Sequence, residues 1–95
     1  MKIYISGQIT GLPEEESRAN FKRAQEYLES AGHTVINPFD LPHNHKKTWD
    51  DYMREDLQAL LTCDTIFMLD NWTKSKGAQI EFNLALDLDM GIILE

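Results

Sequence analysis

Four short apolar segments alternate along the chain with three longer segments in which apolar residues recur every three or four positions. The short segments are rich in β-branched or aromatic residues and are bounded by glycine, proline or polar residues, which is typical of strands. They occupy residues 2–6, 33–37, 65–69 and 92–94. We therefore expect four β-strands.

The longer segments have the spacing and the terminal residues of helices. Thr48 and Ser75 precede the second and the third of them, where a side-chain oxygen can cap a helix. Gly32 and Gly91 follow the first and the third, where glycine commonly ends a helix. The predicted helices cover residues 13–31, 49–63 and 76–90.

The resulting order is βαβαβαβ, and this alternation predicts a parallel sheet with helices on its faces. We expect a single α/β domain over residues 1–95, in three layers (α/β/α), with a four-stranded parallel sheet of the flavodoxin-like or Rossmann-like kind. Ligands of such sheets bind beyond the carboxyl ends of the strands. The loops after Ser6, Asn37 and Asp70 are therefore expected to meet at a ligand site.

Composition and charge narrow the functional classes. Nine basic and sixteen acidic residues give a net charge of −7, which opposes binding to polymeric nucleic acid because few cations can replace the counterions. No apolar run approaches the ~20 residues of a membrane helix, and the N-terminus has no secretory signal pattern. Cys63 is the single cysteine, so no internal disulfide can form. We expect a cytoplasmic protein.

Glu81 is a candidate catalytic carboxylate in the third predicted helix. Its neighbours at i−4 and i+4 are Gly77 and Ala85, so small side chains flank it along one side of the helix. Such a hollow would let a ligand reach a carboxylate that is partly shielded from water, as a nucleophile or general base requires. A solvated glutamate on an exposed helix face explains the same pattern.

Two aspartates are further candidates. Asp56 lies on the apolar side of the second predicted helix, so it is expected to be paired, shifted in pKa or placed at the edge of a cavity. Arg54 and Lys74 are the candidate partners for an ion pair. Asp70 ends the third predicted strand, where it can either hydrogen-bond a substrate or simply start a turn.

The loop after the first strand and the start of the third helix supply candidate binding groups. Glycines in the loop permit close approach of the backbone to a ligand, and a capped helix N-terminus can hold a phosphate or carboxylate. Capping alone explains the helix start equally well. The candidate residues are Tyr4, Ser6, Gly7, Gln8, Gly11, Ser75 and Gly77.

Histidines and aromatic residues add two weaker patterns. His43 and His45 have the look of metal ligands, but no third ligand stands at a suitable spacing, so we expect neither a metal nor another cofactor. Trp49, Tyr52 and Trp72 can stack against a nucleobase or can anchor the core, which is the more common use of such residues.

Taken together, these residues resemble the nucleoside 2-deoxyribosyltransferase superfamily. The matching segments are YISGQITG over residues 4–11, WDDYMREDLQALLTCD over residues 49–64 and SKGAQIE over residues 75–81. The superfamily includes deoxynucleoside 5′-monophosphate N-glycosidases and short phage and bacterial members, and the likeness is greatest to these short members. The resemblance covers most of the chain.

The resemblance implies covalent chemistry on an N-glycosidic bond, with Glu81 as nucleophile, Tyr4 orienting that carboxylate and Asp56 assisting proton transfer at the leaving base. It also implies phosphate contact by Ser75 beside Gly77. Gly7 and Gly11 match the substrate loop of the superfamily. The expected substrate is a small nucleoside or nucleotide.

We therefore expect an N-glycosyl hydrolase or transferase that acts on a 2′-deoxynucleoside or its 5′-monophosphate. Two other functions stay open: a non-catalytic nucleotide-binding module, and a phage accessory protein that binds a host protein through its acidic surface. A homodimer or a larger homo-oligomer is expected, because a four-stranded sheet of this size leaves apolar helix surface to cover.

Overall fold

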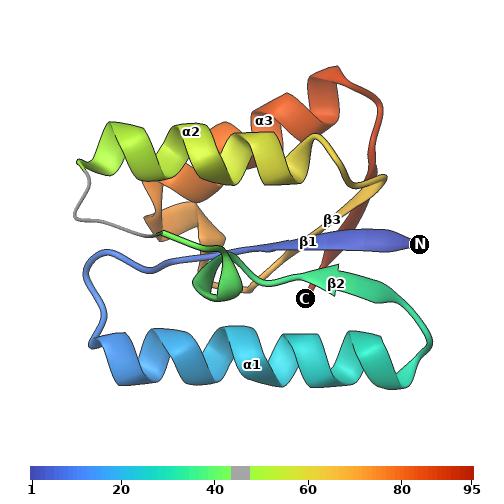
Figure 1. Cartoon of the computed structure of the whole chain (residues 1–95), viewed down its shortest axis with the longest axis horizontal. Coiled ribbons are helices and arrows are strands. Elements are labelled where there is room, and N and C mark those ends of the chain that lie inside the picture. Colours follow the sequence, from blue (N-terminus) through green and yellow to red (C-terminus); the bar gives the residue numbers. More distant parts are fainter. Residues whose placement is uncertain (44–47) are drawn as a thin grey trace.

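A four-stranded parallel sheet forms the centre of the protein, whose computed structural model describes residues 1–43 and 48–95. The strands are β1 (Lys2–Ser6), β2 (Thr34–Ile36), β3 (Thr65–Met68) and β4 (Gly91–Leu94), in the order β2-β1-β3-β4. The helices are α1 (Glu14–Ser30), α2 (Trp49–Leu60) and α3 (Lys76–Asp87). Helix α1 covers one face of the sheet, and α2 and α3 cover the other (Figure 1). The predicted three-layer, Rossmann-like α/β fold is thus confirmed.

Side-chain caps start the second and third helices, as predicted. The Thr48 side chain accepts a hydrogen bond from the Asp51 backbone N–H, and the Asp51 carboxylate accepts one in return from the Thr48 backbone N–H. The Ser75 hydroxyl accepts from the Ala78 backbone N–H at 3.1 Å. These bonds satisfy N–H groups that a helix start leaves unpaired.

Several elements begin or end at residues other than those predicted. Helix α2 ends at Leu60 rather than near residue 63, and α3 ends at Asp87 rather than at residue 90. Asp89 adopts the left-handed conformation after α3, with φ of 54°. Gly91 is not the helix stop but the first residue of β4, where a Cβ would lie 2.8 Å from Thr65 Oγ1. Close packing between strands therefore explains this glycine.

Two short 3₁₀ turns were not predicted. They are η1 (Pro38–Asp40) and η2 (Trp72–Lys74), which follow β2 and β3 at the carboxyl edge of the sheet. Asn37 nucleates η1, because its side-chain oxygen accepts from the Phe39 backbone N–H at 3.0 Å and its carbonyl accepts from Asp40. Such turns are too short to show a helical period in the sequence.

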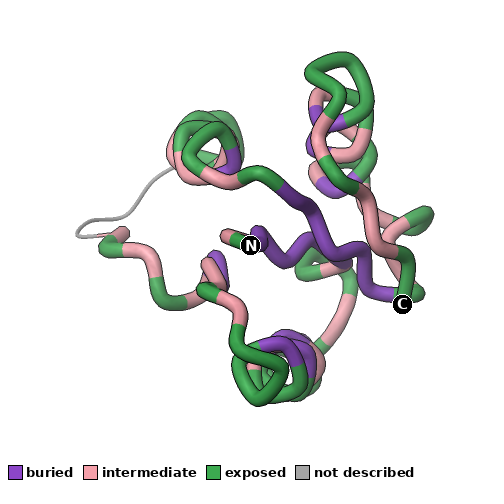
Figure 2. The backbone as a smooth tube through the Cα atoms, turned by 90° about the vertical axis from the view of Figure 1, so that its right-hand side faces the viewer, coloured by how far each residue is buried: buried purple, intermediate pink, exposed green. Residues whose placement is uncertain are grey.

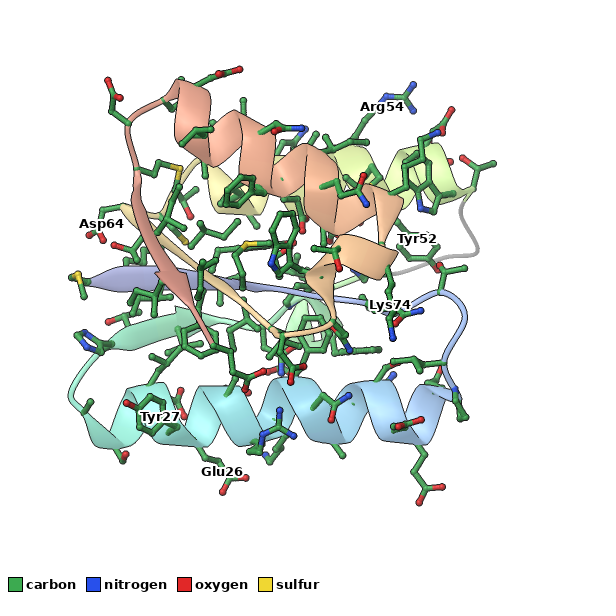
Figure 3. The ribbon with its side chains drawn as sticks, turned by 180° about the vertical axis from the view of Figure 1, so that it is seen from behind. Glu26, Tyr27, Tyr52, Arg54, Asp64 and Lys74 are labelled. Atoms are coloured by element: carbon green, nitrogen blue, oxygen red, sulfur yellow. The ribbon has the colours of Figure 1, made fainter. Side chains whose placement is uncertain are left out.

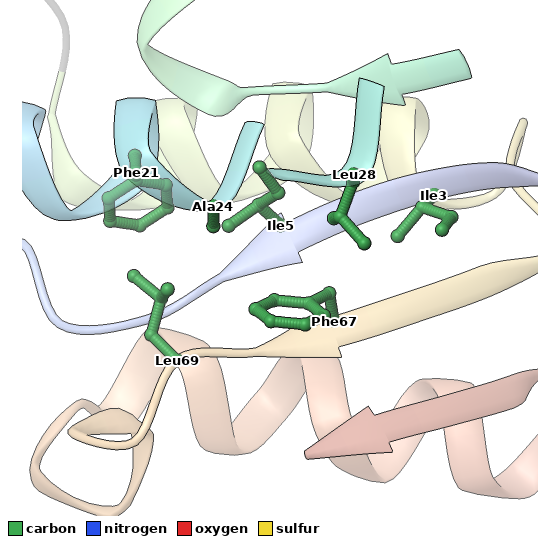
Figure 4. Close-up of a cluster of buried hydrophobic side chains, with 7 residues drawn as sticks. All are labelled: Ile3, Ile5, Phe21, Ala24, Leu28, Phe67 and Leu69. Carbon is green, nitrogen blue, oxygen red and sulfur yellow. The ribbon is translucent and has the colours of Figure 1, made fainter. Parts of the chain in front are cut away.

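Alternation along β1 divides its side chains between the two faces of the sheet. Ile3 and Ile5 pack toward α1 in a cluster that also contains Phe21, Leu28 and Phe67 (Figure 4). Tyr4 belongs to the cluster on the opposite face, under α2 and α3. Successive residues of one strand therefore build both cores.

The central strands are the most deeply buried part of the chain. Every residue of β3 and all but the first of β1 are buried, whereas β2 and β4 at the sheet edges are partly exposed (Figure 2). Polar groups at the carboxyl ends of these central strands are consequently held away from bulk water. Among the described residues, no helix has both the length and the apolar character to cross a bilayer.

Replacing Gly91 by alanine is expected to destabilise the fold by about 1–3 kcal/mol, because the new methyl group would press on Thr65 Oγ1. The same substitution in a Thr65→Ala background is expected to cost less, since the closest contact is then gone. Urea unfolding of the four variants measures both costs. Equal costs in the two backgrounds would show that this contact does not constrain residue 91.

Candidate functional site

A cavity of about 540 Å³ opens at the carboxyl ends of β1 and β2. Its volume lies within the roughly 300–1,000 Å³ of typical small-ligand sites. Five elements, the loop after β1 and the segment after η1 contribute to its walls, so it spans the edge of the sheet and reaches both helical layers. The polar and charged residues that line it are Tyr4, Ser6, Thr10, Glu14, Arg18, His43, Tyr52, Asp56, Ser75 and Glu81.

Glu81 lies in this cavity with both carboxylate oxygens occupied. The Tyr4 hydroxyl donates to Oε2 and the Ser6 hydroxyl donates to Oε1, each at 2.6 Å. Only 5% of the Glu81 surface is exposed. Tyr4 and Ser6 are two residues apart on β1 and so point to the same face of the sheet. The strand thereby holds the carboxylate through two hydrogen bonds in a fixed orientation.

Small residues bring α3 close to its neighbours, but not all of them form the predicted hollow. Gly77 lines the cavity, and a Cβ there would lie 3.0 Å from Met53 Sδ of α2. Ala85 instead packs fully buried in the core beneath α3 and is not among the residues that line the cavity. The open space beside Glu81 is therefore on the Gly77 side only.

Burial raises the pKa values of two groups in the cavity, Glu81 and Tyr4. It raises the pKa of Glu81 to about 7; the hydroxyls of Ser6 and Tyr4 oppose this shift by stabilising the ionised form, and the nearby Asp56 charge adds to it. The pKa of Tyr4 is raised well above its ordinary value by burial and then by Glu81. Tyr4 consequently stays a hydrogen-bond donor at neutral pH. Glu81, by contrast, changes its protonation near neutral pH.

Asp56 is a second perturbed carboxyl in the cavity. Its Oδ1 atom is buried and has no hydrogen-bond partner among the described residues. His43 Nε2 lies 3.8 Å from this oxygen. Burial raises the pKa of Asp56 to about 6, with His43 opposing the shift and Glu55 adding to it. A buried acceptor without a partner is suited to meet a polar group of a ligand.

The ion pairs considered from the sequence are not formed. Arg54 points away from the sheet and bonds the Asp51 carboxylate at 3.2 Å, whereas Tyr52 lies on the sheet side of α2 (Figure 3). Lys74 forms no ion pair with Asp56 in the described part of the chain. The partner of Asp56 is His43, which also contacts Glu55 through Nδ1 and the Tyr52 ring through its edge.

The remaining predicted binding residues divide into two groups. Those that line the cavity are Gly7, Ser75 and Gly77, together with the aromatic residues Trp49 and Tyr52. Those that do not are Gln8, Gly11, Asp70 and Trp72. The Gln8 amide bonds the Thr10 carbonyl within its own loop, and Asp70 is exposed. Trp72 stacks on Phe82 at 4.6 Å, so it serves the core.

The structure adds residues to the site that the sequence did not reveal. His43 was considered only as a metal ligand, and Arg18 and Phe39 were not considered at all. Their cavity positions depend on η1 and on the packing of α1 against it, which no local pattern signals. The described residues hold no cluster of three or more metal-ligating side chains, and His45 lies outside the described residues.

Because the folded-state pKa of Glu81 is about 7 against an ordinary 4.5, this carboxyl binds more protons folded than unfolded between those values. Its ionisation therefore lowers the free energy of unfolding as pH rises from about 5 to 8, by up to about 3 kcal/mol. Glu81→Gln is expected to lose this part of the decline. Urea unfolding at several pH values measures it; parallel pH curves for the two proteins would exclude the shifted pKa.

His43→Asn is expected to raise the pKa of Asp56 further, because it removes the imidazole that opposes the shift. Titration of the Asp56 carboxyl carbon by NMR measures the change. His33→Asn is the matched control, since His33 lies at the far end of the sheet beside the N-terminus. An unchanged Asp56 pKa in His43→Asn would mean that the two groups do not interact.

Comparisons with known proteins agree with this fold. The model of the family described as "Domain of unknown function (DUF4406)" matches residues 1–94, and no curated protein sequence matches the chain. A solved structure of the 2-deoxyribosyltransferase from the psychrotolerant bacterium Bacillus psychrosaccharolyticus superposes with a TM-score of 0.76 at 24% identity, over 99% of this chain and 71% of that one. At this identity the similarity establishes the fold. The family match over nearly the whole chain shows that the protein belongs to the DUF4406 family.

Proposed function

We propose that the protein hydrolyses or exchanges the N-glycosidic bond of a 2′-deoxynucleoside or its 5′-monophosphate, with Glu81 as the nucleophile. The observation that carries the proposal is the buried Glu81 carboxylate in the cavity, with one hydroxyl donor on each oxygen. Such an arrangement aims a carboxylate without a compensating cation, which preserves its nucleophilicity. The fold shared with a 2-deoxyribosyltransferase supports glycosyl transfer as the reaction class.

In the first step a Glu81 oxygen attacks the anomeric carbon of the sugar and the bond from that carbon to the base nitrogen breaks. The electron pair of this bond leaves with the base, and protonated Asp56 neutralises it by giving up its proton. Because Asp56 has the lower pKa of the two carboxyls, the reactive form, with Glu81 ionised and Asp56 protonated, is the less populated of the two singly ionised forms. The product is a glycosyl ester of Glu81. Breaking the bond through an oxocarbenium-like transition state places positive charge next to the carboxylate, which stabilises it.

In the second step water or another base attacks the anomeric carbon and the ester bond to Glu81 breaks. Asp56, now ionised, accepts the proton of the attacking group. Two displacements at one carbon give overall retention of configuration. The surrounding side chains include Tyr4 and Ser6, which hold the carboxylate in line throughout, and Trp49 and Tyr52, which offer aromatic surface to a base.

Glu81→Gln is expected to reduce base release and base exchange at least about 1,000-fold, because the nucleophile is removed. Wild-type kcat/KM is expected to follow a bell-shaped pH profile with both limbs between about pH 5 and 8, reflecting Asp56 near 6 and Glu81 near 7. The assay is chromatography of bases released from a panel of deoxynucleosides and deoxynucleotides, with and without a second free base.

Glu26→Gln on α1 is the matched control, because Glu26 lies on the exposed surface. Intact-mass measurement of rapidly quenched reactions should also show the mass of one deoxyribosyl group on wild type and not on Glu81→Gln. Equal inertness of wild type and Glu81→Gln against the whole panel contradicts the proposal. Calorimetric nucleotide binding without turnover would favour the non-catalytic binding module instead.

A further inference from the structure

The α1 side of the cavity has no role in the chemistry proposed above. Its walls there come from α1 and from η1, on the face of the sheet opposite to α2 and α3 (Figure 1). Arg18 of α1 is the only lysine or arginine among the described residues that line the cavity. The other ionisable side chains that line the site, apart from Tyr4 and Tyr52, are three carboxyls and one histidine, namely Glu14, Asp56, Glu81 and His43. Arg18 therefore differs from them in chemistry, and we ask what it could bind.

Arg18, whose side chain is 54% exposed, stacks on an aromatic ring. Its guanidinium carbon lies 4.6 Å from the centre of the Phe39 ring. That ring is fixed in turn, since it meets the buried Phe21 edge-on at 5.2 Å and its backbone N–H bonds Asn37 Oδ1. Asn37 is itself buried and donates to Gln25 of α1. The guanidinium therefore rests on a surface anchored to the core.

One edge of the guanidinium remains available to a ligand. Arg18 Nε bonds Glu14 Oε2 at 3.3 Å, and neither Nη group has a hydrogen-bond partner among the described residues. A planar pair of N–H donors selects two acceptors side by side. Phosphate and carboxylate offer such a pair, and so do O6 and N7 of guanine or hypoxanthine.

The charge of Glu14 favours a neutral ligand beside Arg18 over an anionic one. The Glu14 carboxylate pairs with the guanidinium at the exposed surface of α1, so a phosphate dianion at this position would also meet a nearby negative charge. A 6-oxopurine carries no charge and keeps both acceptors. Adenine presents an amino donor in place of O6, so its N–H would face the N–H groups of Arg18. The same donor pair therefore attracts one purine and repels the other.

We propose that Arg18 recognises the O6 and N7 acceptors of a 6-oxopurine, so that the preferred leaving base is guanine or hypoxanthine rather than adenine. This inference rests on the proposed function, whose substrate it specifies. Arg18 and Asp56 come from opposite helical layers, and O6/N7 and N3 lie on opposite edges of a purine. Asp56 gives its proton to N3 as the bond at N9 breaks, while Arg18 donates to the other edge.

The test compares kcat/KM for deoxyinosine, deoxyguanosine and deoxyadenosine, and for their 5′-monophosphates. Arg18→Met keeps much of the apolar stem but removes the donors, and Arg18→Lys keeps the charge but removes the planar pair. Both are expected to lower the ratio of deoxyinosine to deoxyadenosine turnover about 10-fold or more. Arg23→Met is the matched control, because Arg23 is on α1 but bonds Glu95 outside this cavity.

An unchanged ratio of deoxyinosine to deoxyadenosine kcat/KM in Arg18→Met overturns the inference. An equal loss of kcat/KM with all the nucleosides overturns it as well. A loss confined to the 5′-monophosphates, with the base ratio intact, also overturns it and makes Arg18 an anion contact. If wild type releases no base at all, the proposed function fails separately. Calorimetry with free hypoxanthine and adenine then tests Arg18 alone: a preference for hypoxanthine that Arg18→Met abolishes supports base recognition, and no preference refutes it.

Discussion

The candidate site depends on a carboxyl group that the fold removes from water. Ionised Glu81 would be costly at 5% exposure without partners. The hydroxyls of Tyr4 and Ser6 supply those partners and contribute no charge of their own. The result is a group that titrates near neutrality and keeps one orientation. A lysine or arginine in place of the hydroxyls would also have stabilised the carboxylate, but its charge would have held the pKa low and reduced the nucleophilicity of the oxygens.

The alternation of β1 allows the same five residues to serve the core and the site. Ile3 and Ile5 complete the cluster under α1, while Tyr4 and Ser6 reach Glu81 on the other face. A slip of one residue in the pairing of β1 with β3 would exchange these two sets. The geometry of the site and the stability of the sheet therefore depend on one register.

The fold and part of the site could be predicted because they rest on local patterns. Strand and helix periods with caps at Thr48 and Ser75 were sufficient for the element order and the parallel sheet, whereas the meeting of Tyr4 with Glu81 was expected only from the family resemblance. Element ends were less predictable: Asp89 took the left-handed conformation where Gly91 was expected to end the helix. The Asp56–His43 pair and the Arg18–Phe39 stack depend on η1, whose turn follows from a single asparagine side chain and tertiary packing.

The cavity crosses the edge of the sheet, and this has a consequence for how the family can diversify. The residues proposed for bond cleavage come from β1, α2 and α3, whereas the Arg18–Phe39 wall comes from α1 and η1. Substitutions in that wall can change substrate selectivity without disturbing the residues proposed for bond cleavage. One ancestral scaffold can in this way give rise to homologues that keep the residues around Glu81 and differ in the substrate they accept.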